Sequence, residues 1–259
     1  MKKILLPLFA LVCQQTFGQV NLWSDNFNTA NGPLDSSSLA GRLSGLAAGE
    51  TYMQSFGTEQ SIENDQLALA TSGGVRFGGQ TSRYDWAGAT TGPSILAAGG
   101  FNVSFDWTTI DNTDTEWIGL KVGTPDNDSH ISDGDIDNAI LMRKNGGTQI
   151  FDDGAGSAGN NFTTISGGGT YAVSLTYTFS SFANGSLVDV VAEVNGDTIA
   201  DSSFTWNQNG SLYMDLEGDS TGNTISDFAI TTLAPVPEPS TALLGLVGGC
   251  AVLIWRRRH

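Results

Sequence analysis

Apolar and polar residues alternate along much of the chain between residues 19 and 233. The alternation is strictest from Phe101 to Trp107 and from Tyr171 to Phe179, where every second residue is apolar. Successive side chains of a β-strand point to opposite faces, so these runs predict strands with one buried and one solvent-facing side. Trp107 belongs to the apolar set of the first run and is expected to face inward, as is Trp206, two residues after Phe204.

Shorter apolar runs, separated by residues typical of turns, predict further strands. These runs are residues 117–122, 139–142, 188–194 and 225–230. Asn195-Gly196 follows one of them directly and favours a two-residue hairpin turn. No amphipathic helix of useful length is expected. About ten to twelve short strands at this spacing predict an all-β fold, a single antiparallel β-sandwich or jelly roll over residues 19–233.

The first 18 residues do not follow this pattern. Two lysines precede an uninterrupted apolar run over residues 4–12, and small residues follow at Thr16 and Gly18. This layout predicts a secretory signal peptide over residues 1–18, cleaved before Gln19. A buried N-terminal helix is the alternative. A lipid-attached Cys13 is less favoured, because no small residue stands directly before it.

The last 26 residues, 234–259, form a separate tail. Three prolines within residues 235–239 prevent a helix or strand from continuing. Residues 242–255 are then free of charge, and as a helix they would be about 21 Å long. This length is less than the thickness of the hydrocarbon core of a bilayer, which is about 30 Å. We expect a short transmembrane helix, with the basic residues that follow it on the cytoplasmic side.

The order of features in this tail resembles the PEP-CTERM sorting signal of bacterial exported proteins. The motif residues are Val236, Pro237, Glu238 and Pro239, and the basic cluster after the apolar segment is Arg256, Arg257 and Arg258. The resemblance implies export, recognition by an exosortase-type sorting protease and removal of the tail near the Pro-Glu-Pro element. It further implies a transient stay in the inner membrane, followed by delivery to the cell envelope or extracellular matrix. An ordinary single-pass anchor is the alternative.

The segment between the two ends loosely resembles concanavalin A-like and laminin-G-like jelly rolls. The stretches that carry this resemblance are residues 23–27, 117–122, 191–196 and 225–230. It implies a jelly-roll fold and suggests an extracellular polysaccharide as a partner.

Charge narrows the choice of partners. Residues 19–239 hold all 27 acidic residues of the chain and six basic ones, a formal charge of −21. Such a surface repels nucleic acid, so no nucleic-acid partner is expected, and it attracts cations and basic partners. The acidity is equally explained by the solubility of an exported protein. The two cysteines, Cys13 and Cys250, lie in the terminal segments, which excludes disulfides and cysteine-based zinc sites in between.

The densest acidic cluster lies between two predicted strands, at residues 126–137. Calcium requires several oxygen ligands, and alternating carboxylates on a loop that contains glycine can provide them. The spacing differs from an EF-hand, in which Ile131 would occupy the glycine position. A solvated acidic loop is the alternative. The predicted calcium ligands are Asp126, Asp128, Asp133 and Asp135.

No catalytic residues are predicted. Laminarinase-type hydrolases on jelly rolls carry two glutamates around an aspartate on one face of a strand, because acid and nucleophile must flank the scissile bond. Glu217-Gly218-Asp219 provides half of such a pattern. The chain contains no Gly-x-Ser-x-Gly element, and His130 is the one histidine between the two ends.

The aromatic residues suggest one exposed platform for a sugar. Tyr84 and Trp86 stand among Gly, Ser and Thr residues and are the candidate ligand-binding pair. The leading hypothesis is a non-catalytic exported protein associated with polysaccharide or matrix. The alternatives are a polysaccharide-active hydrolase or lyase and a structural surface-layer protein.

Overall fold

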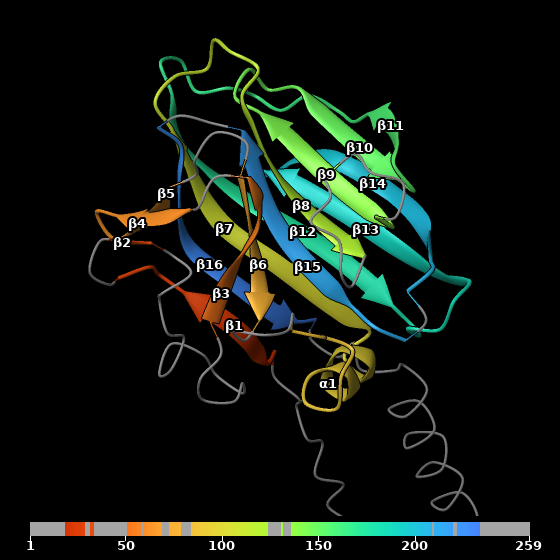
Figure 1. Cartoon of the computed structure of the whole chain (residues 1–259). Helices are drawn as coiled ribbons and strands as arrows, with labels where there is room; N and C mark the ends of the chain where they lie inside the picture. The colour runs from red at the N-terminus through yellow and green to blue at the C-terminus, as the bar shows by residue number, and fades with distance from the viewer. Residues whose placement is uncertain are drawn as a thin grey trace, which may run out of the picture.

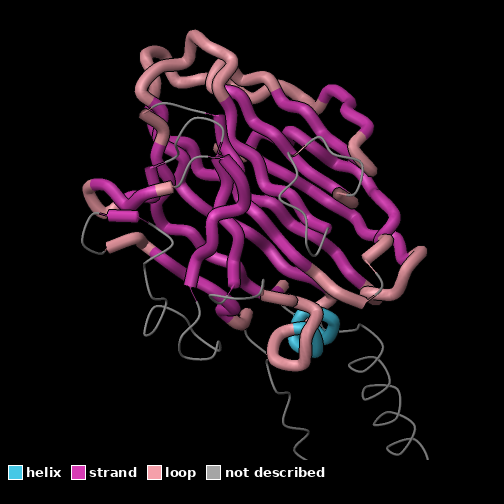
Figure 2. The backbone as a smooth tube through the Cα atoms, viewed as in Figure 1, coloured by secondary structure: helices cyan, strands magenta, loops and turns pink. Residues whose placement is uncertain are grey.

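The computed structural model describes residues 19–28, 32–33, 51–57, 60–68, 73–78, 84–123, 131, 136–208, 210–219 and 222–233. These residues form 16 strands and one short helix, and strands account for nearly all of the regular structure (Figure 2). Two antiparallel sheets pack face to face as a jelly-roll sandwich (Figure 1). The predicted all-β, antiparallel fold is confirmed.

The first sheet, sheet A, has nine strands. They are β1 (Asn21–Asp25), β2 (Gly32–Pro33), β4 (Ser61–Glu63), β5 (Gln66–Ala68), β7 (Gly100–Thr109), β12 (Gly169–Phe179), β13 (Ser186–Val194), β14 (Asp197–Trp206) and β16 (Thr224–Thr232). Their order is β14-β13-β12-β7-β16-β5-β4-β2, and β1 also pairs with β16. The last strand in sequence therefore lies inside the sheet, with β7 on one side and β5 and β1 on the other.

The second sheet, sheet B, has seven strands. They are β3 (Thr51–Gly57), β6 (Gly73–Gly78), β8 (Trp117–Gly123), β9 (Asn138–Arg143), β10 (Thr148–Asp152), β11 (Ala155–Ala158) and β15 (Tyr213–Asp219). Their order is β11-β10-β9-β8-β15-β6-β3. The pairing of β8 with β15 places residues that are far apart in sequence side by side at the middle of this sheet.

The strands predicted from alternation are all present. They correspond to β7, β8, β9, β12, β13 and β16. Asn195 and Gly196 form the turn between β13 and β14, with φ angles of 51° and 84°, as a two-residue hairpin requires. The strand count exceeds our expectation, because β2, β4, β5 and β11 have only two to four residues, too few to show an alternating pattern.

The space between the sheets is filled by one large apolar cluster that is rich in aromatic rings. Trp107 and Trp206 are both fully buried in it, as predicted. The ring of Trp206 meets Phe179 edge to face, with the ring centroids 5.2 Å apart. Helix α1 (Gly92–Ala97) lies at one end of the sandwich, where Ile95 is buried in the same cluster (Figure 1).

A second, smaller apolar cluster lies on the outer face of sheet B. Ile118 and Leu120 of β8 face the main core, so Trp117 points the other way, to this second cluster. Its remaining members are Ile131, Ile136, Ala139, Leu141 and Phe151. Ile131 and Ile136 follow β8 in sequence and pack in this cluster over the outer face of sheet B.

The two ends of the described chain lie next to each other in the structure. The amide of Thr232 donates to the carbonyl of Val20 at 2.8 Å, and the amide of Val20 donates to Oγ1 of Thr232 at 2.8 Å. In the part of the chain that the structure describes, no helix has the length and apolar character needed to cross a bilayer. The predicted signal peptide and tail helix lie outside the described residues.

Candidate functional site

Three charged side chains meet on the outer face of sheet B. Lys121 of β8 lies directly opposite Asp215 of β15, and Glu217 is two residues further along the same strand. Nζ of Lys121 donates to Oε1 of Glu217 at 2.9 Å and lies 3.1 Å from Oδ2 of Asp215. The side chains of Lys121, Asp215 and Glu217 are 6%, 1% and 0% exposed, so this is a buried ionic network.

Ile131 covers this network on the outer face of sheet B. Its amide donates to Oε2 of Glu217 at 2.8 Å, and its side chain is fully buried. The residue opposite Glu217 on β8 is Gly119, and a Cβ atom there would overlap Cδ1 of Ile131. The missing side chain of Gly119 thus lets Ile131 approach, and both carboxyl oxygens of Glu217 have partners inside the protein.

The environment of Glu217 changes its acidity. Burial raises its pKa to about 7, because the charged form loses its hydration. The charge and hydrogen bond of Lys121 and the amide of Ile131 act in the opposite direction, while the neighbouring charge of Asp215 adds to the increase. A carboxyl group with a pKa near neutrality is able to exchange protons with its neighbours.

Our sequence prediction missed part of this network. The sequence prediction used Glu217 and Asp219 as half of an alternating acidic pattern and overlooked Asp215, two residues before Glu217. Asp215, Glu217 and Asp219 alternate along β15, and in a strand this spacing places all three on one face. A second signal was available in Lys121, a charged residue inside the apolar run of residues 117–122.

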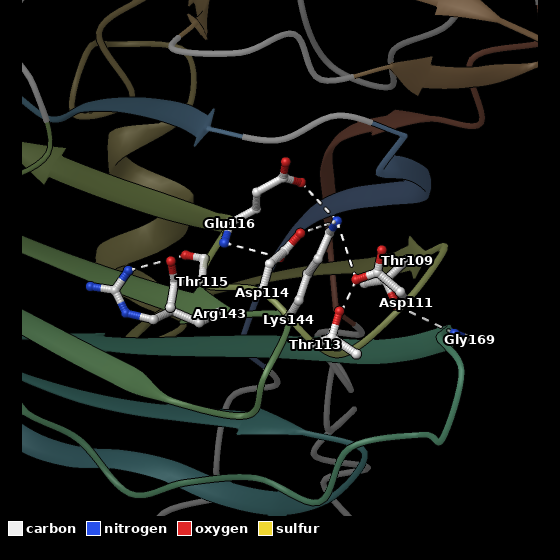
Figure 3. A network of polar contacts seen from close by, with 9 residues as sticks. All are labelled: Thr109, Asp111, Thr113, Asp114, Thr115, Glu116, Arg143, Lys144 and Gly169. Atoms are coloured by element: carbon white, nitrogen blue, oxygen red, sulfur yellow. Dashed lines mark hydrogen bonds and ion pairs between the residues drawn. The ribbon is translucent and has the colours of Figure 1, made fainter.

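A second buried lysine holds a loop to sheet B. Nζ of Lys144 lies 2.7 Å from Glu116 Oε2, 3.3 Å from Asp114 Oδ2 and 3.7 Å from Asp111 Oδ1 (Figure 3). Burial lowers the pKa of Lys144, but the hydrogen bonds and charges of Glu116 and Asp114 outweigh this and raise the pKa above its ordinary value. The ammonium group therefore remains charged and fixes the segment between β7 and β8.

A depression lined by both polar and apolar residues lies on the outer face of sheet A. Its volume is about 310 Å³, and residues of β7, β12, β13 and β16 line it. The polar side chains among them are Ser104, Asp106, Ser174, Glu193 and Asp227. Asn102, further along β7, donates to Ser174 Oγ and Thr176 Oγ1 at 2.8 and 2.9 Å. Hydroxyl, amide and carboxylate groups therefore lie on this face of sheet A, beside the apolar lining residues Phe105, Ala172 and Val173.

The predicted exposure of Trp86 is wrong. Its indole is fully buried and packs against Trp23, with ring centroids 5.5 Å apart, while Tyr84 packs edge-on against it at 4.8 Å. The reason lies in Asp85, whose Oδ1 accepts hydrogen bonds from the amides of Ala87 and Leu212 at 3.0 and 2.8 Å. These bonds tie the segment to the body of the sandwich and turn Trp86 inward. Tyr84 is half-buried, and the pair presents no open indole face to a sugar.

The predicted calcium ligands lie outside the described residues. This applies to Asp126, Asp128, Asp133 and Asp135, so calcium binding there stays a prediction. Within the described residues, no three or more His, Cys, Asp or Glu side chains are grouped so as to hold a metal ion.

The tail has a match among known protein families. Residues 235–258 match the PEP-CTERM protein-sorting motif. The predicted resemblance of the tail is thereby confirmed. The motif implies export, processing by an exosortase and sorting to the cell envelope.

No curated protein sequence matches the chain. Several solved structures are similar to it at low identity. A sialidase has a TM-score of 0.43 and 10% identity over 80% of this chain, which spans only 19% of the sialidase. A mutant of alginate lyase Aly36B in complex with an alginate trisaccharide has a TM-score of 0.47 and 13% identity, covering 82% of this chain and 97% of the lyase. The carbohydrate-binding module CBM66 from Bacillus subtilis has a TM-score of 0.39 and 14% identity, covering 70% of this chain and 95% of the module.

Proposed function

We propose that this protein is a non-catalytic component of the cell envelope or extracellular matrix whose sandwich binds polysaccharide after export. The sorting motif at residues 235–258 supports the destination. The burial of Glu217 on β15 supports the absence of catalysis. The depression on sheet A supports binding.

The observation that carries the proposal is the burial of Glu217. A glycoside hydrolase needs an acid and a nucleophile that reach the scissile bond from both sides. Glu217 is 0% exposed, with one oxygen bonded to Lys121 and the other to the amide of Ile131. The acids of β15 thus have the spacing of a hydrolase strand, yet two of the three, Asp215 and Glu217, are closed to a substrate.

The depression on sheet A is the better binding surface. Its serines and carboxylates match the hydroxyl groups of a sugar, which donate and accept hydrogen bonds. Asp106, Glu193 and Asp227 also give it a negative charge, as does the formal charge of −21 over residues 19–239. Polyanionic chains such as alginate are repelled by this field. We therefore propose a neutral or amino-bearing polysaccharide as the ligand.

Two measurements on the full chain test this function. Affinity electrophoresis through gels that contain a neutral β-glucan, chitosan or alginate measures binding, and a reducing-end assay on the same polymers measures cleavage. We expect retardation by the glucan or chitosan with no new reducing ends. Release of reducing ends or of unsaturated uronates would instead make the protein an enzyme. Self-assembly without any retardation would make it a surface-layer subunit.

A further inference from the structure

The buried network of Lys121, Asp215 and Glu217 contains the reactants for a covalent bond. We propose that Nζ of Lys121 condenses with the side-chain carboxyl of Asp215 to form an amide that joins β8 to β15, with Glu217 transferring the protons. This modification goes beyond the proposed function and is independent of any ligand.

The reacting atoms are already in place. Lys121 and Asp215 are direct cross-strand partners, and Nζ lies 3.1 Å from Oδ2. Backbone pairing along all seven residues of β15 fixes the two strands relative to each other. Holding two reacting groups in such a geometry raises their effective concentration to about 10⁵ M or more. Oδ2 is bonded directly to Cγ, so Nζ lies beside the carbon atom that it would attack.

The two groups react in their neutral forms, at a site from which water is largely excluded. An ammonium ion and a carboxylate do not condense, whereas a neutral amine and a carboxylic acid do. The neutral amine forms when Nζ passes a proton to Oε1 of Glu217, which accepts its hydrogen bond at 2.9 Å. Water is also largely excluded from side chains that are 6% and 1% exposed, which disfavours hydrolysis of the product.

Glu217 is placed to carry the protons. Its Oε1 accepts a hydrogen bond from Nζ at 2.9 Å, and burial raises its pKa to about 7. As the lone pair of Nζ attacks Cγ of Asp215, Glu217 takes a proton from Nζ and returns it to the departing hydroxyl. One C–N bond forms, one C–O bond breaks and one water molecule leaves. The step requires no oxidant, reductant or cofactor.

Lys144 provides a matched comparison inside the same chain. It is as deeply buried as Lys121 and contacts three carboxylates, but those of Asp111, Asp114 and Glu116 are 36%, 41% and 28% exposed. The hydrogen bonds and charges of Glu116 and Asp114 raise the pKa of Lys144 above its ordinary value. Lys144 therefore stays an ammonium ion and forms no amide.

The amide would serve an exported protein whose sandwich contains no disulfide, because it contains no cysteine. The two cysteines of the chain, Cys13 and Cys250, lie outside residues 19–239. A bond between residues 121 and 215 would close a large loop of the unfolded chain, as a disulfide does in other secreted domains.

Mass spectrometry of the denatured full chain tests the proposal. We expect a mass about 18 Da below that of the sequence after the same terminal processing, and a branched peptide that contains Lys121 and Asp215 after proteolysis. K121R and D215A should have their full masses. D215N should lose ammonia, about 17 Da, in place of water. E217Q should accumulate the uncrosslinked form, and K144R should keep the 18 Da deficit.

Two results would overturn the proposal. The first is a wild-type chain that is folded by circular dichroism and has its full mass. The second is an 18 Da deficit that persists in K121R, which would place the loss of water elsewhere. The first result is read on the wild-type chain alone, so a variant that fails to fold does not affect it.

Discussion

Ile131 lies directly over Gly119, so close that a Cβ atom on Gly119 would overlap its Cδ1 atom. Overpacking a tight contact of this kind costs about 1–3 kcal/mol. We expect G119A to lower the free energy of unfolding by this amount, as measured by urea denaturation. The added methyl group would also approach the carbonyl of Ile140 at 2.8 Å, so the strand pairing itself would be strained.

A double-mutant cycle separates the two contributions. I131A removes the atom that the new methyl group would meet, so G119A should cost less in the I131A background than in the wild type. Strictly additive effects would contradict the close approach of Ile131.

Stability should depend on pH through Glu217. The pKa of its carboxyl is about 7 in the folded protein and 4.5 in its ordinary state, so the folded state binds the proton more tightly. This contribution to stability is fully present below pH 4.5 and is lost as the pH rises through 7. Its size is roughly 3 kcal/mol. E217Q cannot titrate, and its unfolding free energy should change less between pH 4.5 and 7.5.

The control for this experiment is E63Q. Glu63 is an exposed carboxylate on β4, far in sequence from the network. Urea midpoints at several pH values should show the wild-type pH dependence in E63Q and a flatter one in E217Q. If the urea midpoints of the two variants depended equally on pH, Glu217 would not be the cause of the pH dependence.

Lys144 should contribute more to stability than any one of its partners. Removing it in K144M leaves three carboxylates that repel one another, with an expected loss of about 1–3 kcal/mol. D111N removes the most distant contact, 3.7 Å from Nζ and partly hydrated, and should cost less than about 1 kcal/mol. Thermal unfolding of both variants measures the difference, and a loss in D111N as large as that in K144M would contradict this description.

The depression on sheet A should lose its ligand when its charges are removed. The triple variant D106N/E193Q/D227N replaces three acceptors by amides of the same shape, so we expect retardation by glucan or chitosan to weaken by about tenfold or more. D201N changes an exposed aspartate of β14 outside the depression and should bind as the wild type does. Equal loss in both variants would mean that only the overall charge matters.

Local patterns in the sequence were enough to predict the strands. Alternation identified β7 and β12, and Asn195-Gly196 identified the hairpin, because both signals depend on neighbouring residues. The network around Lys121 depends instead on the pairing of β8 with β15, and Lys121 and Glu217 are 96 positions apart. Trp86 was misplaced for a similar reason, since the distant amide of Leu212 holds Asp85 and turns the neighbouring indole inward.

The position of β16 determines how the protein responds to tension. A pulling force transmitted through the segment after the sandwich would act at Leu233, directly after this strand. β16 is hydrogen-bonded to β7 on one side and to β5 and β1 on the other. A pull along its axis loads these bonds together in shear, whereas an edge strand would peel away one bond at a time. The strand nearest the sorting motif is therefore placed to bear mechanical load.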